Sequence, residues 1–170
     1  FNFLTIILGL ASMLLAFSYP FMKRITFWPQ LFLGLTFNWG VIMAASSINN
    51  EISIDVIILY ISAIFWTLGY DTIYGAQDMS DDEIIGLKST AIKFKKNIKF
   101  FVAVSYIVSI LILLFLFIDN LGLNIFSVLF LFFSISLLYQ IKKFNVKNPK
   151  SCLKMFKLNN LTGFLLFVSI

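Results

Sequence analysis

The stretch FFVAVSYIVSILILLFLFI, from Phe100 to Ile118, carries no charge and is long enough to cross a bilayer as an α-helix. Backbone polar groups inside a membrane must bond internally, so an apolar run of this length predicts a transmembrane helix. Comparable apolar segments cover residues 3–17, 27–46, 54–68, 121–141 and 158–170. Of the 170 residues, 60% are hydrophobic and 12% are charged, which is outside the range of soluble domains. We therefore predict an all-α, polytopic transmembrane helix bundle, with six spans in one membrane domain covering residues 1–170.

Both ends of the chain fall inside apolar segments. The first residue is Phe1 and not Met, and the segment that ends at Ile170 is shorter than the ~20 residues of a full crossing. The charged, apolar and small-residue pattern of a signal peptide does not occur at the start. We therefore expect a truncated part of a longer protein.

The charged residues divide the connections between spans into two sets. All 13 Lys and Arg residues lie in the connections at residues 18–27, 69–99 and 142–157. Because successive spans cross in opposite directions, these three connections fall on the same face. The other connections carry only Glu51, Asp55 and Asp119. Because basic loops stay in the cytoplasm, we predict that the basic face is cytoplasmic, in a bacterial inner membrane or its mitochondrial equivalent. Topology and anionic lipid account for most of these lysines, so we expect the bilayer, and no nucleic acid, as their partner.

Five carboxylates lie within YDTIYGAQDMSDDEIIGLKST, Tyr70 to Thr90, on the predicted cytoplasmic face. If the helix of the third span continues through them at ~100° per residue, Asp71, Asp78 and Asp82 fall on one stripe. Such a stripe can present several oxygens to one divalent cation, and the repulsion among its charges favours a bound cation. The chain has no His and one Cys, at position 152, so the cation would be a hard one such as Mg²⁺.

The same residues also fit the start of a helix. Ser80 and Glu83 have the spacing of a capping box with Ser80 as N-cap, and Asp81 and Glu83 would then serve a helix N-terminus. Asp71 and Asp78 precede that cap and gain nothing from its dipole. Metal binding and capping compete mainly for Asp82, and both interpretations stay open.

A second group of candidates closes the first span on the same face. The segment Tyr19-Pro20-Phe21-Met22-Lys23-Arg24 combines a hydroxyl group with two cations, which suits a diphosphate. Aromatic belts and basic anchors have the same composition, so membrane anchoring is the alternative. Lys88, with Ser89 and Thr90 after Gly86, could contribute in the same way.

The run Asp71-x-x-Tyr74-x-x-x-Asp78-x-x-x-Asp82, followed by Gly86-Leu87-Lys88-Ser89-Thr90, resembles the second aspartate-rich motif of the UbiA superfamily of intramembrane prenyltransferases. Its context, GYDTIYGAQDMSDDEIIGLKSTA, is most similar to the 4-hydroxybenzoate polyprenyltransferase branch. Tyr19-Pro20 with Lys23-Arg24-Ile25-Thr26 resembles the YPxxKRxT element of that branch, and Asn148-Pro149 through Asn159-Asn160 resembles its C-terminal stretch. The resemblance extends over nearly the whole chain.

The resemblance implies a nine-helix bundle that transfers a polyprenyl group from polyprenyl diphosphate to 4-hydroxybenzoate in ubiquinone biosynthesis. It also implies that Mg²⁺ is held by Asp78, Asp82 and Asp71, that the diphosphate is bound by Tyr19, Lys23, Arg24 and Lys88, and that Tyr74 contacts substrate. The family's first motif, of the form NDxxDxxxD, matches nothing in this sequence. That motif therefore either lies in upstream sequence or is absent, and we expect the 170 residues alone to be inactive.

Several alternatives stay open. One is a UbiA-type enzyme with another acceptor, and another is a non-catalytic membrane fragment. An ion-transport module is a third, although every charged residue lies in a loop or at a helix end, where interfacial chemistry is favoured over transport. The CDP-alcohol phosphotransferases also carry aspartate-rich motifs, but their DGxxAR pattern is missing.

Overall fold

The computed structural model describes residues 2–169, and all regular secondary structure in these residues is helical, which confirms the predicted fold class. The elements are α1 (Phe3–Ile25), α2 (Pro29–Phe37), α3 (Trp39–Asn49), α4 (Ile54–Gly75), α5 (Met79–Ile85), α6 (Thr90–Lys93), α7 (Ile98–Leu116), the 3₁₀ turn η1 (Ile118–Asn120), α8 (Ile125–Lys143) and α9 (Pro149–Ser169).

Five segments of residues 2–169 are long and apolar enough to cross a membrane, namely α1, the α2–α3 pair, α4, α7 and α8. The α2–α3 pair is one span interrupted at Asn38. Of the sixth predicted segment, residues 158–170, the part up to residue 169 forms the second half of α9, and residue 170 lies outside the described residues. The first half of α9 carries Lys150, Lys154 and Lys157 and is therefore less apolar. The described residues thus contain five such spans and not the six that we predicted.

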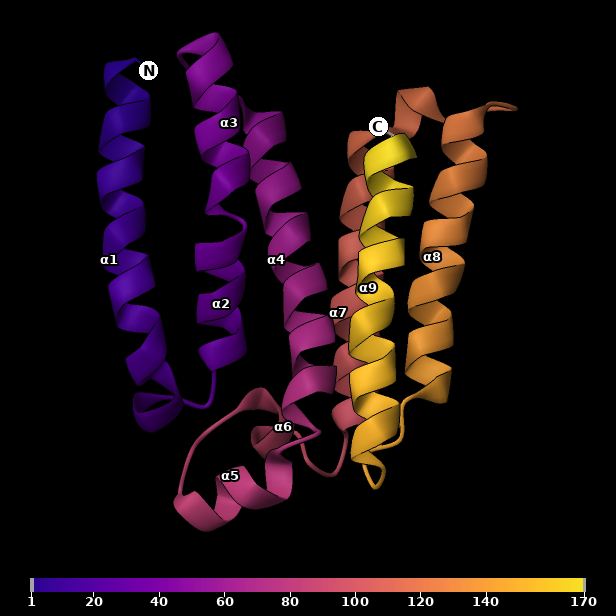
Figure 1. Cartoon of the computed structure of the whole chain (residues 1–170). Coiled ribbons are helices and arrows are strands. Elements are labelled where there is room, and N and C mark those ends of the chain that lie inside the picture. Colours follow the sequence, from indigo (N-terminus) through magenta and orange to yellow (C-terminus); the bar gives the residue numbers. More distant parts are fainter. Residues whose placement is uncertain (1, 170) are drawn as a thin grey trace.

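The long helices lie side by side and alternate in direction (Figure 1). The connections α1–α2, α4–α7 and α8–α9 all lie at the lower end of the bundle in that view, where α5 and α6 also lie. These connections carry the lysine and arginine residues, so the prediction that they share one face is confirmed.

The central helix is α4. It packs against α7 and α9 on one side and against α2 and α3 on the other (Figure 1). A larger buried cluster contains Tyr106, Phe133 and Leu137, and a smaller one contains Tyr60 and Ile64. Because both groups of helices contact α4, its last turn is held at the centre of the basic end.

Candidate active site

The acidic stretch folds as two helices. The first, α4, ends at Gly75, and α5 begins at Met79. The amide of Gln77 bonds to the carbonyl of Tyr74 at 2.9 Å, a tighter turn that ends the α-helix. Of the two interpretations left open, the one that needs a continuous helix is therefore wrong, and helical phase does not carry over from Asp71 to α5.

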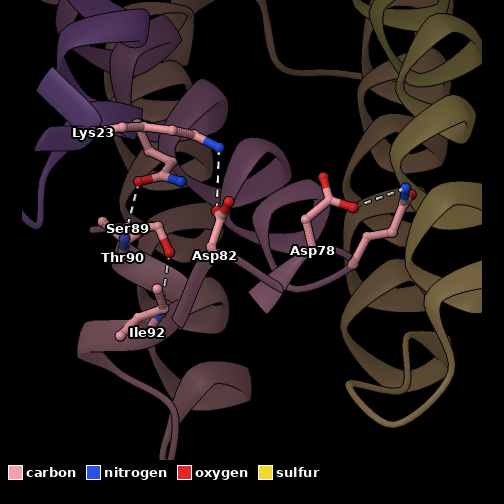
Figure 2. Close-up of polar contacts among 8 residues, drawn as sticks. Lys23, Asp78, Asp82, Ser89, Thr90 and Ile92 are labelled. Carbon is pink, nitrogen blue, oxygen red and sulfur yellow. Dashed lines mark hydrogen bonds and ion pairs between the residues drawn. The ribbon is translucent and has the colours of Figure 1, made fainter. Parts of the chain in front are cut away.

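Asp78 and Asp82 do lie one turn apart and point to the same side of α5 (Figure 2). Asp78 occupies the N-cap position, but its side chain makes no capping hydrogen bond. The predicted N-cap, Ser80, lies inside the helix, so the predicted capping box is wrong. Asp81 and Asp82 are in the first turn, where the helix dipole favours carboxylates. Glu83 instead pairs with a lysine, because Lys95 Nζ donates to its Oε1 atom at 2.8 Å.

The C-terminal end of α1 is bonded to α5 and to the loop that follows it. Lys23 Nζ lies 3.2 Å from Asp82 Oδ2, and the Asp82 side chain is only 9% exposed (Figure 2). The backbone amide of Lys88 donates to the carbonyl of Lys23 at 2.7 Å, and Lys88 Nζ donates to the carbonyl of Ile25 at 3.2 Å. Three predicted site residues therefore meet here, and a lysine from another helix offsets the charge of Asp82.

The other predicted residues lie at the ends of α1 and α4. The charge of Lys23 is close enough to interact electrostatically with Asp71. Tyr19 is close enough to interact in the same way with Asp71 and Tyr74. The ring of Tyr74 packs against Phe156 of α9, with centroids 4.7 Å apart. Arg24 lies in the last turn of α1, and it forms no ion pair within residues 2–169.

The segment from Gly86 to Thr90 fixes α5 against the bundle. Gly86 ends α5 with a φ of 80°, in the left-handed region that favours glycine. Ser89 caps α6 with its side chain. Thr90 is buried, its amide donates to Gln30 Oε1 at 2.9 Å, and its hydroxyl lies 2.7 Å from Thr72 Oγ1. Ser89 and Thr90, which were considered as diphosphate contacts, are thus engaged in holding the fold.

The donor atoms suit a hard cation, but they are not preassembled as predicted. Within residues 2–169, no three His, Cys, Asp or Glu side chains lie close enough to hold a metal ion, so Asp71, Asp78 and Asp82 do not form a three-carboxylate group. Gln77 Nε2 donates to Asp78 Oδ1 at 3.3 Å, while Gln77 Oε1 is buried and bonded to no described group. Carboxylate and amide oxygens are ligands that Mg²⁺ prefers. Gln77 and Asp78, just before α5, and Asp82 in its first turn therefore supply ligand atoms that suit a hard divalent cation, which would take further ligands from elsewhere.

A cavity of about 260 Å³ lies deeper in the bundle, between α2, α4 and α9. It is lined by Phe37, Asn38, Trp66, Thr67, Tyr70, Phe156, Asn159 and Asn160. These side chains supply aromatic rings, hydroxyl groups and amides, but no charge. Tyr70 directly precedes Asp71, so the cavity adjoins the acidic end of α4.

None of the predicted site residues lines this cavity. Two of the lining side chains bond to each other between helices, since Asn38 Nδ2 donates to Thr67 Oγ1 at 2.8 Å. Asn159-Asn160 entered only through the resemblance of the C-terminal stretch. The one usable signal was the presence of polar side chains inside apolar helices, which does not distinguish an interhelical contact from a cavity wall.

Comparison with known proteins finds relatives over nearly the whole chain. The chain matches the model of the UbiA prenyltransferase family over residues 1–161. It is 41% identical over 171 residues to the mitochondrial 4-hydroxybenzoate polyprenyltransferase of Bos taurus, an alignment that covers 99% of this chain and 46% of that protein. It is 40% identical over 170 residues to the 4-hydroxybenzoate octaprenyltransferase of Psychromonas ingrahamii, covering 99% of this chain and 59% of that protein. The chain therefore belongs to the UbiA prenyltransferase family, and it is an integral membrane protein.

The chain spans about half the length of these relatives. Among solved structures, the apo structure of a UbiA homologue from Aeropyrum pernix K1 superposes with a TM-score of 0.78 at 20% sequence identity. That match covers 99% of this chain and 63% of the other chain. At this level of identity, the likeness shows the fold alone, and it confirms the membrane helix bundle.

Proposed function

We propose that this chain supplies one half of the active site of a Mg²⁺-dependent polyprenyltransferase, which transfers a polyprenyl group to 4-hydroxybenzoate in ubiquinone biosynthesis. The observation that carries the proposal is the pair Asp78 and Asp82 on one side of α5, with Lys23 of α1 beside Asp82. Carboxylates for a cation and a lysine for phosphate oxygens, side by side at a membrane surface, suit a lipid diphosphate. The relatives from Bos taurus and Psychromonas ingrahamii are named 4-hydroxybenzoate polyprenyltransferase and 4-hydroxybenzoate octaprenyltransferase.

In this proposal Asp78 and Asp82 hold Mg²⁺, and Asp71 adds a carboxylate from the end of α4. Tyr19, Lys23 and Arg24 bind the diphosphate from α1, with Lys88 beside them, and Tyr74 contacts the substrate. Bound Mg²⁺ would neutralise the diphosphate as a leaving group. The side chains of α1 add hydrogen bonds and positive charge that stabilise the same group while the allylic carbon–oxygen bond breaks.

The cavity between α2, α4 and α9 is proposed to receive the acceptor ring. Its aromatic walls and neutral polar groups suit an aromatic ring that bears a hydroxyl substituent. Because Tyr70 lines the cavity and Asp71 follows it in α4, a ring in the cavity would lie next to the acidic end where the allylic cation forms. The ring carbon ortho to the hydroxyl would then be alkylated and would lose its proton, which restores the aromatic ring, while diphosphate leaves with the electrons of the broken carbon–oxygen bond.

The basic face is proposed to be cytoplasmic, or to face the equivalent compartment in mitochondria. The lysines and arginine at this end follow the distribution that retains positive loops on that side. The charged diphosphate group of the substrate would then enter the site at the membrane–water interface, while the polyprenyl tail stays in the bilayer.

The direct test measures transfer of a radiolabelled polyprenyl group to 4-hydroxybenzoate in membranes that contain the full-length protein, because the 170 residues alone are expected to be inactive. Asp78→Asn and Asp82→Asn are each expected to lower kcat by about 100-fold or more, the loss typical of removing one electrostatic contact to the leaving group. Asp81→Asn is the matched control, because Asp81 is exposed on the same helix and is not assigned to the site. Near-normal turnover in both site variants would overturn the metal assignment. Turnover with a naphthoate, and none with 4-hydroxybenzoate, would overturn the assignment of 4-hydroxybenzoate as the acceptor.

A further inference from the structure

A buried network of polar side chains crosses four helices at the side of the cavity. Tyr106 of α7 donates to Gln140 Oε1 of α8 at 2.7 Å. Gln140 and Asn159 of α9 exchange hydrogen bonds, Asn159 Nδ2 to Gln140 Oε1 at 3.2 Å and Gln140 Nε2 to Asn159 Oδ1 at 3.3 Å. Trp66 Nε1 of α4 donates to Asn159 Oδ1 at 3.0 Å. Tyr106 and Gln140 are completely buried, so the network is shielded from both lipid and water.

The two ends of this network have different surroundings. Trp66 and Asn159 line the cavity, whereas Tyr106 and Gln140 lie behind them and do not. Both polar atoms of Asn159 are already bonded within the protein, its Nδ2 atom also to backbone carbonyls of α9. Asn159 is therefore occupied in holding the indole N–H of Trp66, and Gln140 in turn orients Asn159.

Packing fixes the same rings. The Trp66 ring lies edge-on to Tyr70 and Phe133, with centroids 6.1 Å and 5.4 Å away. A Cβ atom at Gly163 would lie 3.2 Å from the Trp66 ring, so α9 approaches the indole closely. Inside a bilayer, leaving a buried polar group unpaired costs free energy. The side chains of the network are therefore held in the orientations that keep their hydrogen bonds, and these orientations fix the cavity wall.

We propose that Tyr106 and Gln140 are positioning residues, which act through Asn159 to fix Trp66 as a rigid wall for the acceptor ring. This inference rests on the proposed function in assigning the ring to the cavity. It goes further in assigning acceptor affinity to two residues that do not contact the acceptor. Loss of the Tyr106 hydroxyl removes one of the two donors to Gln140 Oε1 and leaves the bond from Asn159, so the amide pair is held less firmly and the indole gains mobility within its packing.

The test uses Tyr106→Phe, which keeps the ring, and Tyr60→Phe as the matched control. Tyr60 is also buried and donates one hydrogen bond, 2.7 Å to the carbonyl of Leu35, but it belongs to the other buried cluster. Tyr106→Phe is expected to raise the KM for 4-hydroxybenzoate about 3- to 10-fold, the range that one buried hydrogen bond supports, and to leave the KM for polyprenyl diphosphate unchanged. Tyr60→Phe is expected to change neither KM.

A mutant cycle with Trp66→Phe tests the route of the effect. If Tyr106 acts through Trp66, then Tyr106→Phe raises the KM of the wild type but has no further effect in the Trp66→Phe background. Equal KM increases in both backgrounds, or an equal increase in Tyr60→Phe, would overturn the positioning role. Gln140→Met should reproduce the Tyr106→Phe pattern, since it removes the amide at similar length.

A spectroscopic measurement separates this inference from the proposed function. With Trp28 and Trp39 replaced by Phe, Trp66 is the remaining tryptophan of the sequence. Its emission anisotropy should fall in Tyr106→Phe and stay unchanged in Tyr60→Phe, with or without turnover. An inactive full-length wild-type protein would refute the proposed function only, whereas unchanged anisotropy in Tyr106→Phe would refute the positioning role only.

Discussion

Lys23 Nζ and Asp82 Oδ2 lie 3.2 Å apart and join two segments that are 59 residues apart in the sequence. The pair holds the end of α1 against α5, and the neighbouring bond from the Lys88 amide to the Lys23 carbonyl reinforces it. Asp82 is nearly buried, so its charge depends on this partner more than an exposed carboxylate would. Lys23 is half exposed and can therefore meet a ligand at the same time.

Lys23→Met should weaken binding of polyprenyl diphosphate. The substitution removes one cation beside the diphosphate and leaves Asp82 without its ion pair, and we expect KM for the diphosphate to rise by roughly 10- to 100-fold, as for a charge-assisted contact of ~1.5–3 kcal/mol. Initial rates at varied diphosphate concentration would show this. Lys96→Met serves as control, because Lys96 is exposed on the same face and has no partner in the structure among residues 2–169. Equal changes in the two variants would mean that general surface charge, and not the Lys23 contact, is responsible.

Gln30→Leu should loosen the acidic segment without touching a carboxylate. Gln30 is 2% exposed and accepts the hydrogen bond of the Thr90 amide, which would be left buried and unpaired. We expect a loss of about 1–3 kcal/mol in the free energy of unfolding. Thermal unfolding in detergent, followed by helical circular dichroism, measures it. Ser47→Ala removes an exposed hydrogen bond within α3 and should change stability little, and a similar loss in both variants would contradict the role of Gln30.

The sequence predicts the helices of this bundle better than their ends. Long apolar runs have few alternatives in a bilayer, so the helical class and the shared face of the basic loops followed from the pattern. The break after Gly75 did not, because Ala76, Gln77 and Asp78 include no proline or glycine that would stop a helix. The residues that follow the turn bond to α1 through Asp82 and to α2 through Thr90, and local sequence does not encode these contacts.

The candidate site was predictable as a set of residues, but not as a geometry. Asp78 and Asp82 share a side because their spacing lies within one helix turn, whereas Asp71 belongs to a separate helix. The partner of Asp82 comes from α1, and no local pattern connects position 23 to position 82. The cavity was unpredictable for the same reason, since Trp66 and Asn159 meet only through the packing of α4 against α9.

Cys152 should react slowly with thiol reagents. It is fully buried, its thiol donates to the carbonyl of Asn145 at 3.3 Å, and burial raises the pKa of the thiol. Because the thiolate is the nucleophile, a raised pKa lowers the reactive fraction at neutral pH, and labelling should accelerate only at more alkaline pH than for a free cysteine. Maleimide labelling between pH 7 and pH 9.5 tests this. A cysteine introduced by Ser80→Cys, at an exposed position of α5, is the reference, and equal labelling of both sites at neutral pH would contradict the burial of Cys152.

Gly69→Ala should destabilise the bundle, while Gly40→Ala should not. A Cβ atom at position 69 would overlap the Cδ1 and Cε1 atoms of Tyr106, whose ring is completely buried and cannot move aside. We expect a loss of about 1–3 kcal/mol in the free energy of unfolding, the usual cost of overpacking. A Cβ atom at position 40 would have nothing within 4 Å, and alanine favours the helix there by up to ~1 kcal/mol. Thermal unfolding of the two variants in one detergent compares them directly. If Gly69→Ala unfolds at the wild-type temperature, the ring of Tyr106 does not lie against α4, and the hydrogen bond from Tyr106 to Gln140 loses its structural basis.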